Sequence, residues 1–143
     1  MPDHPGSVQR ALVVYREGRR GDAALREAAE LAAAGVELDV VTLAPQAQPL
    51  RCCRGGGATG AYNCAISDAA DDELRQAREL LGTLAERATY TKLVGTPWPP
   101  LAGWAAERAF DVVLVPRNRF ARGGGRLARE LRAATSADIR LAG

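Results

Sequence analysis

The sequence predicts a single α/β domain, built on an open sheet of five parallel strands with helices on both faces. Short runs of apolar and β-branched residues alternate with longer amphipathic stretches, which is typical of right-handed βαβ units. The length of 143 residues suits one domain. Hydrophobic residues make up 47% of the chain but aromatic residues only 5%, so we expect a core of Val, Leu, Ile and Ala, which suits a buried parallel sheet.

Each element has its own local signal. The segments that combine β-branched and apolar residues between turns are expected to be strands: 10–15, 36–43, 89–94, 111–115 and 138–141. Those with helical apolar periodicity are 23–34, 67–87, 101–109 and 126–134. Asp22 is a candidate N-cap of the first helix, and Gly35 is expected to end it. The acidic run 71–73 is expected in the first turn of the second helix, where the helix dipole favours negative charge.

The element order also defines the domain organisation. Residues 1–8 are expected to form a flexible leader, and 9–143 the domain, with a Cys- and Gly-rich insertion at 45–65. In open parallel sheets, ligands bind beyond the carboxyl ends of the strands, at the point where strand order reverses. The loops after the first, second and fourth strands are therefore the expected ligand site.

Composition narrows the class of function. The net charge is +2, and seven arginines lie between 117 and 140, but with few aromatic residues among them, so nucleic-acid binding is not favoured. The N-terminal residues do not resemble a signal peptide and no apolar run is long enough for a membrane span, so we expect a cytoplasmic protein. His4 is the only histidine, which leaves no Ser/His/Asp or Cys/His set. A binding or regulatory module is favoured over an enzyme.

Three cysteines in the insertion are the second candidate site. Cys52, Cys53 and Cys64 lie close together in sequence, and arginines at 51 and 54 flank the first two. Neighbouring cations favour thiolate, which suits a thiol-redox site. Metal binding is another interpretation, although an adjacent cysteine pair chelates one ion poorly and further ligands would be needed. The third interpretation is that all three are reduced thiols without a special role.

Several motifs together resemble the universal stress protein family. They are Gly21-Asp22-Ala23-Ala24-Leu25 before a helix that ends at Gly35, the strand at 36–43, Val94-Gly95-Thr96-Pro97, the stretch 105–115, and the closing helix and strand. The resemblance implies the same sheet, and many members bind ATP. It also implies pairing into a homodimer through the last strand. By this resemblance Leu43 is expected to supply a backbone contact to a nucleotide.

The sequence departs from the family's phosphate-binding loop. After the first strand, Arg16-Glu17-Gly18 replaces the family's Asp-Gly-Ser, and after the fourth strand Pro116 and Arg119 stand where two glycines are typical. Gly125 matches the third glycine, and Arg126 replaces Ser or Thr. Two interpretations stay open. In the first, guanidinium groups hold the phosphates of ATP, of another adenine nucleotide or of a small phosphorylated ligand. In the second, nucleotide binding is lost. The candidate residues are Leu43, Arg117, Arg119, Gly123, Gly124, Gly125 and Arg126.

Overall fold

Five parallel strands form one open sheet in the order β3-β2-β1-β4-β5, which confirms the expected fold class. The computed structural model describes residues 8–47, 57–95, 99–117 and 125–143, without the side chains of 57 and 58. The strands are β1 (Arg10–Val14), β2 (Glu37–Pro45), β3 (Ala88–Gly95), β4 (Val112–Pro116) and β5 (Asp138–Ala142). Every pairing is parallel, with Val13 opposite both Val40 and Leu114 at the centre.

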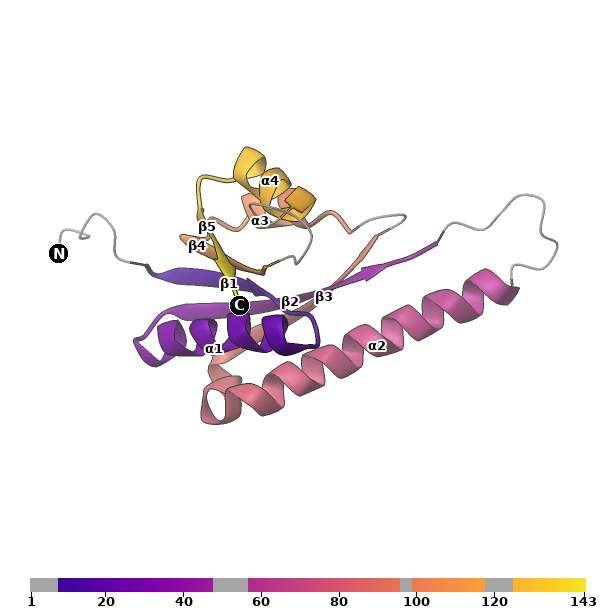
Figure 1. Ribbon diagram of the computed structural model, residues 1–143, viewed down its shortest axis with the longest axis horizontal. Helices are drawn as coiled ribbons and strands as arrows, with labels where there is room; N and C mark the ends of the chain where they lie inside the picture. The colour runs from indigo at the N-terminus through magenta and orange to yellow at the C-terminus, as the bar shows by residue number, and fades with distance from the viewer. Residues whose placement is uncertain (1–7, 48–56, 96–98, 118–124) are drawn as a thin grey trace.

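Helices cover both faces of the sheet (Figure 1). One face carries α1 (Arg19–Ala33), α2 (Gly57–Leu81) and the 3₁₀ helix η1 (Gly82–Arg87), and the other carries α3 (Leu101–Ala106) and α4 (Gly125–Ala134). Alternate residues of each strand enter opposite cores, because successive side chains of a strand point to opposite faces. Thus Val13 packs in the α1–α2 core and Val14 in the α3–α4 core.

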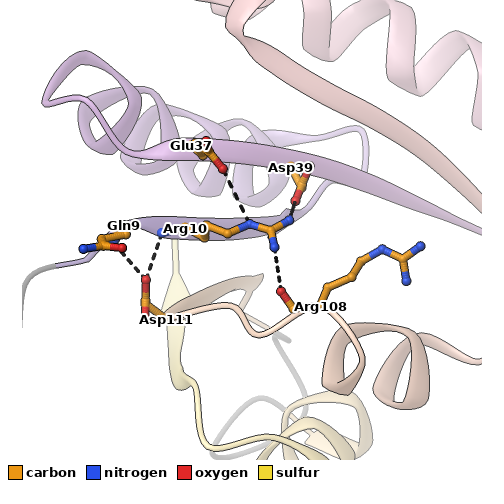
Figure 2. A network of polar contacts seen from close by, with 6 residues as sticks. All are labelled: Gln9, Arg10, Glu37, Asp39, Arg108 and Asp111. Atoms are coloured by element: carbon orange, nitrogen blue, oxygen red, sulfur yellow. Dashed lines mark hydrogen bonds and ion pairs between the residues drawn. The ribbon is translucent and has the colours of Figure 1, made fainter.

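A polar network joins β1, β2 and the residue before β4 at the amino ends of these strands (Figure 2). Arg10 donates to the Arg108 carbonyl at 2.8 Å and to Asp39 at 3.1 Å. Asp111 accepts the backbone N–H groups of Arg10 and Gln9 at 2.9 and 2.8 Å. Between these anchors Ala109 has a φ of 50°, the only positive φ of a non-glycine residue in the described ranges. The network holds a strained turn that brings the chain from α3 into β4.

Two helices begin earlier than the sequence indicated. Helix α1 starts at Arg19 with Gly18 as its N-cap, so Asp22 lies inside the first turn and is not the cap. Helix α2 starts at Gly57, so the later part of the proposed insertion 45–65 is helical. Asn63 explains part of this extension, because its amide both donates to and accepts from the backbone of Ala47 just after β2, at 3.1 and 2.9 Å.

The longer α2 also changes the role of its acidic residues. Residues 71–73 lie well inside the helix, so the expectation that they complement its dipole is wrong. Each has another partner: Asp71 pairs with Lys92, Asp72 with Arg75, and Glu73 accepts the Thr42 hydroxyl at 2.5 Å. The acidic residues therefore tie α2 to β2 and β3, or to its own next turn.

Within the described residues, none of the helices combines the length and hydropathy that crossing a membrane requires.

Candidate functional site

The strand order places the switch point at the carboxyl ends of β1 and β4. From β1 the chain winds outward through β2 and β3, then crosses back to β4 on the other side of β1. Crevices for ligands form at such reversals, because the loops after the two strands diverge in opposite directions. Here the loop from Tyr15 to Gly18 follows β1, and Arg117 follows β4.

The N-terminus of α1 lies beside this switch point, because Arg20 in its first turn reaches the Arg117 carbonyl. Gly18 is its N-cap, with a φ of 127° that favours glycine, and no side chain caps the helix. Gly21 lies so close to the preceding loop that an added Cβ would stand 1.6 Å from the Arg16 carbonyl oxygen. The loop after β1 is thus pressed against the first turn. The first N–H groups of a helix have no intrahelical partner, so this end is suited to an anion.

Arg20 bridges the switch point from α1 to the end of β4. Its Nη1 donates to the Arg117 carbonyl at 2.8 Å, and the Arg117 N–H donates to the Ala142 carbonyl at 2.9 Å. Arg16 and Arg19 are both exposed, as is Glu17 between them. Arginines at a helix N-terminus oppose the helix dipole, typically by about 0.3–1 kcal/mol each.

A buried tyrosine at the end of β1 contacts the acidic residue in the first turn of α1. The Tyr15 hydroxyl donates to Asp22 at 2.9 Å, and Tyr15 is 1% exposed. Burial, followed by the Asp22 hydrogen bond and the charges of Asp22, Glu17 and Glu73, raises the pKa of Tyr15 far above its usual range. The phenol therefore remains a hydrogen-bond donor at any pH at which the protein is studied.

The candidate nucleotide-binding residues from the sequence analysis do not all lie at the switch point. Arg117 is at the switch point, whereas Leu43 lies within β2 opposite Leu93 and is partly buried in the α3–α4 core. Gly125 begins α4 with a φ of 70°, and Arg126 is paired with Glu130 at 2.6 Å on the exposed side of the helix. Arg119, Gly123 and Gly124 lie outside the described residues.

The cysteine site is only partly within the described chain. Cys64 is an exposed free cysteine on α2, and Cys52 and Cys53 lie outside the described residues. Among the residues that are described, no group of three His, Cys, Asp or Glu side chains is placed to hold a metal ion. Thiol-redox and metal functions therefore stay sequence-based predictions.

Sequence reasoning missed Arg20 and the Tyr15–Asp22 pair. Asp22 has the signature of an N-cap, which hid the earlier start of the helix. The signal that was present is Arg19-Arg20 beside Gly18, two basic residues where helices prefer acidic ones. The partners of Arg20 and Tyr15 depend on the fold.

The strand order and the helices on both faces of the sheet define a doubly wound α/β fold. No family model matches the chain, and no curated protein matches its sequence. Solved structures do share its fold. A universal stress protein from Lactobacillus plantarum is 15% identical with a TM-score of 0.71, over 95% of this chain and 98% of that one.

Two further universal stress proteins were solved with nucleotides. One, from Archaeoglobus fulgidus in complex with dAMP, is 21% identical with a TM-score of 0.62, over 96% of this chain and 98% of that one. The other, in complex with cAMP, is 18% identical with a TM-score of 0.61, over 95% and 97%. The chain therefore has the universal stress protein fold.

Proposed function

We propose that this chain is a non-catalytic binding module for an adenine nucleotide, held at the carboxyl ends of β1 and β4. The observation that carries the proposal is the hydrogen bond from Arg20 to the Arg117 carbonyl, beside a start of α1 that no side chain caps. Two proteins of this fold were solved with dAMP and cAMP, which supports a nucleotide as the ligand class.

The phosphate contacts differ from those of a glycine-rich loop. Pro116 has no N–H group to offer, so the end of β4 lacks one backbone donor. Guanidinium groups replace such donors well, because each presents several N–H groups in a planar fork that matches phosphate oxygens. In this arrangement Arg20 and Arg117 contact the phosphates, and the dipole of α1 adds favourable potential. The module thus retains binding with altered contacts.

Calorimetric titration with ATP, AMP and adenosine tests the proposal. We expect ATP to bind most tightly and adenosine most weakly, because the proposed contacts are to phosphate. Arg20→Gln removes one charge-assisted contact and should weaken ATP binding at least tenfold. Arg26→Gln makes the same change at an exposed position further along α1 and should leave the affinity within about twofold.

Two results would contradict this function. Absence of heat with millimolar ATP would mean that nucleotide binding is lost and that the module acts through another surface. Equal losses in Arg20→Gln and Arg26→Gln would mean that net charge, not the bridge, attracts the ligand. An Arg126→Ala variant is informative beside them, since Arg126 already pairs with Glu130 and is expected to contribute less than Arg20.

We further propose that the module is a homodimer formed through β5, which is an edge strand of the sheet. Exposed strand edges are natural surfaces for pairing with a second copy. Light scattering coupled to size-exclusion chromatography measures the mass directly, and a monomeric mass at tens of micromolar protein would contradict the dimer.

A further inference from the structure

The outer edge of β3 lacks the features that usually prevent pairing with another strand. β3 is the terminal strand on the β2 side of the sheet, and no other strand of the described ranges pairs with it. It keeps register with β2 over all eight of its residues, without a bulge, and it contains no proline. Natural proteins interrupt such regular edges with bulges, prolines or exposed lysines, because an uninterrupted edge pairs readily with a second strand.

The one charged residue of β3 is Lys92, and its charge is compensated by α2. Its ammonium group donates to Asp71 at 2.9 Å and to Ser67 at 2.8 Å. A lysine protects a strand edge by projecting its charge into solvent, where a second strand would have to bury it. Lys92 instead lies against the helix, so it does not prevent pairing.

The ladder with β2 shows which backbone groups of β3 point outward. The Gly95 carbonyl accepts the Gln46 N–H at 2.8 Å, so the backbone groups of Gly95 face β2. Successive residues of a strand direct their N–H and C=O groups to alternate sides. The residues whose backbone groups face outward are therefore Ala88, Tyr90, Lys92 and Val94.

Helix α2 places opposite charges at two levels along β3. Asp71 lies beside Lys92, and the Arg78 guanidinium lies 4.4 Å from the centre of the Tyr90 ring, so the helix runs antiparallel to the strand (Figure 1). Thr91 is midway between these levels. A two-fold axis at Thr91 brings Arg78 of one copy to the level of Asp71 of the other. An axis at either neighbouring residue would bring like charges to the same level, which is unfavourable.

We propose that β3 pairs antiparallel with β3 of a second copy about a two-fold axis at Thr91, so that the two sheets become continuous. In this register Lys92 of one copy is opposite Tyr90 of the other, and Val94, which is 43% exposed, is opposite Ala88. Identical edges suit this arrangement, because each residue and its counterpart exchange roles across the axis. The interface is separate from the pairing proposed at β5, on the other edge of the sheet, and does not depend on nucleotide binding.

The register predicts one specific cross-link. Thr91 is opposite Thr91 of the other copy in a non-hydrogen-bonded pair, whose Cα atoms are about 4.5 Å apart, within the range of a disulfide. The Thr89 residues of the two copies are offset by four residues, about 14 Å, which is too far. Both threonines lie on the α3–α4 face of β3, because they alternate with residues that face α2. Thr91→Cys and Thr89→Cys are therefore matched variants.

Each variant is made in a chain whose native cysteines are replaced by serine at 52, 53 and 64, and thermal melts verify folding. After mild oxidation at tens of micromolar protein, we expect a disulfide-linked dimer of Thr91→Cys on a non-reducing gel and a monomer of Thr89→Cys. A cross-link in neither variant, or an equal one in both, would overturn the pairing. A dimeric mass by light scattering without the Thr91→Cys cross-link would also overturn it, and would leave the β5 dimer standing.

A proline at the outward position 94 tests the same interface without cysteines. Val94→Pro removes an outward N–H and leaves the ladder to β2 intact, and symmetry makes it remove two hydrogen bonds per dimer. Association through β3 should weaken about tenfold, measured by light scattering over a dilution series. Val94→Thr keeps the N–H and the branched side chain and should associate as the wild type does. Equal association of Val94→Pro and Val94→Thr would contradict the proposed pairing.

Discussion

Gly21 provides a test of the junction between the loop after β1 and α1. A Cβ built at this position stands 1.6 Å from the carbonyl oxygen of Arg16, 2.7 Å from its carbonyl carbon and 3.2 Å from its nitrogen. Non-bonded carbon and oxygen atoms do not approach within about 3 Å, and the opposing atoms belong to the backbone, which cannot swing aside as a side chain does. Gly21→Ala must therefore move the loop or the first turn of the helix.

The expected cost follows from that displacement. Overpacking by one carbon typically costs about 1–3 kcal/mol, and a clash with backbone atoms belongs at the upper end, near 3 kcal/mol. For a domain of this size the melting temperature should fall by about 10 °C. The displaced loop carries Arg16 and supports the start of α1, so ATP affinity should fall as well.

Gly103→Ala is the matched control, with the opposite sign. Gly103 is exposed in α3, and a Cβ built there meets nothing within 4 Å. Alanine in a helix is favoured over glycine by about 0.5–1 kcal/mol, so this variant should melt about 2 °C higher than the wild type. Differential scanning calorimetry measures both shifts. A Gly21→Ala protein as stable as the wild type would refute the close approach of the loop to α1.

The remaining predictions concern the turn into β4. Ala109→Gly relieves a φ of 50° and should stabilise the protein by about 0.5–1 kcal/mol, whereas Ala34→Gly, at a φ of −84°, should not stabilise it; melting curves that place both variants below the wild type would contradict the strain. The N–H groups of Arg10 and Gln9 lower the pKa of Asp111 below its ordinary value of 3.8, so this carboxylate stabilises the fold above about pH 4 and its contribution is lost as pH falls through the lowered pKa. Asp111→Asn should therefore be less stable than the wild type in urea denaturation at pH 7, and the gap should narrow at pH 3; a gap that is the same at both pH values would contradict the assignment.

The strands were predictable because their signals are local. Valine-rich runs such as 111–115 are apolar on both faces, as a strand covered by two layers of helices must be, and Val112, Val113 and Leu114 are all fully buried. Their alternation with helical segments implies parallel crossovers. This was enough to predict the parallel sheet, and it selected Arg117, which directly follows β4, as a candidate site residue.

The helix starts were less predictable because they depend on distant partners. The stretch before residue 67 is rich in Gly and Ala and has no cap signal of its own, yet α2 extends through it, and Asn63 bonds the backbone of Ala47. Asp22 has the chemistry of an N-cap, but the Tyr15 hydroxyl takes its carboxylate, and Gly18 caps the helix instead. Neither partner can be identified from sequence neighbours.

The amino-acid sequence by itself determined the layered architecture, because hydrophobic periodicity and turn residues act over a few neighbouring positions. Only the tertiary structure decided which polar groups meet at the switch point. Arg20 and Arg117 are separated by most of the chain, and Gly21 must be glycine only because the Arg16 carbonyl is folded onto it. Contacts of this kind arise from strand order and helix packing, which bring together residues that are far apart in the sequence. The local sequence around one residue does not indicate its distant partner.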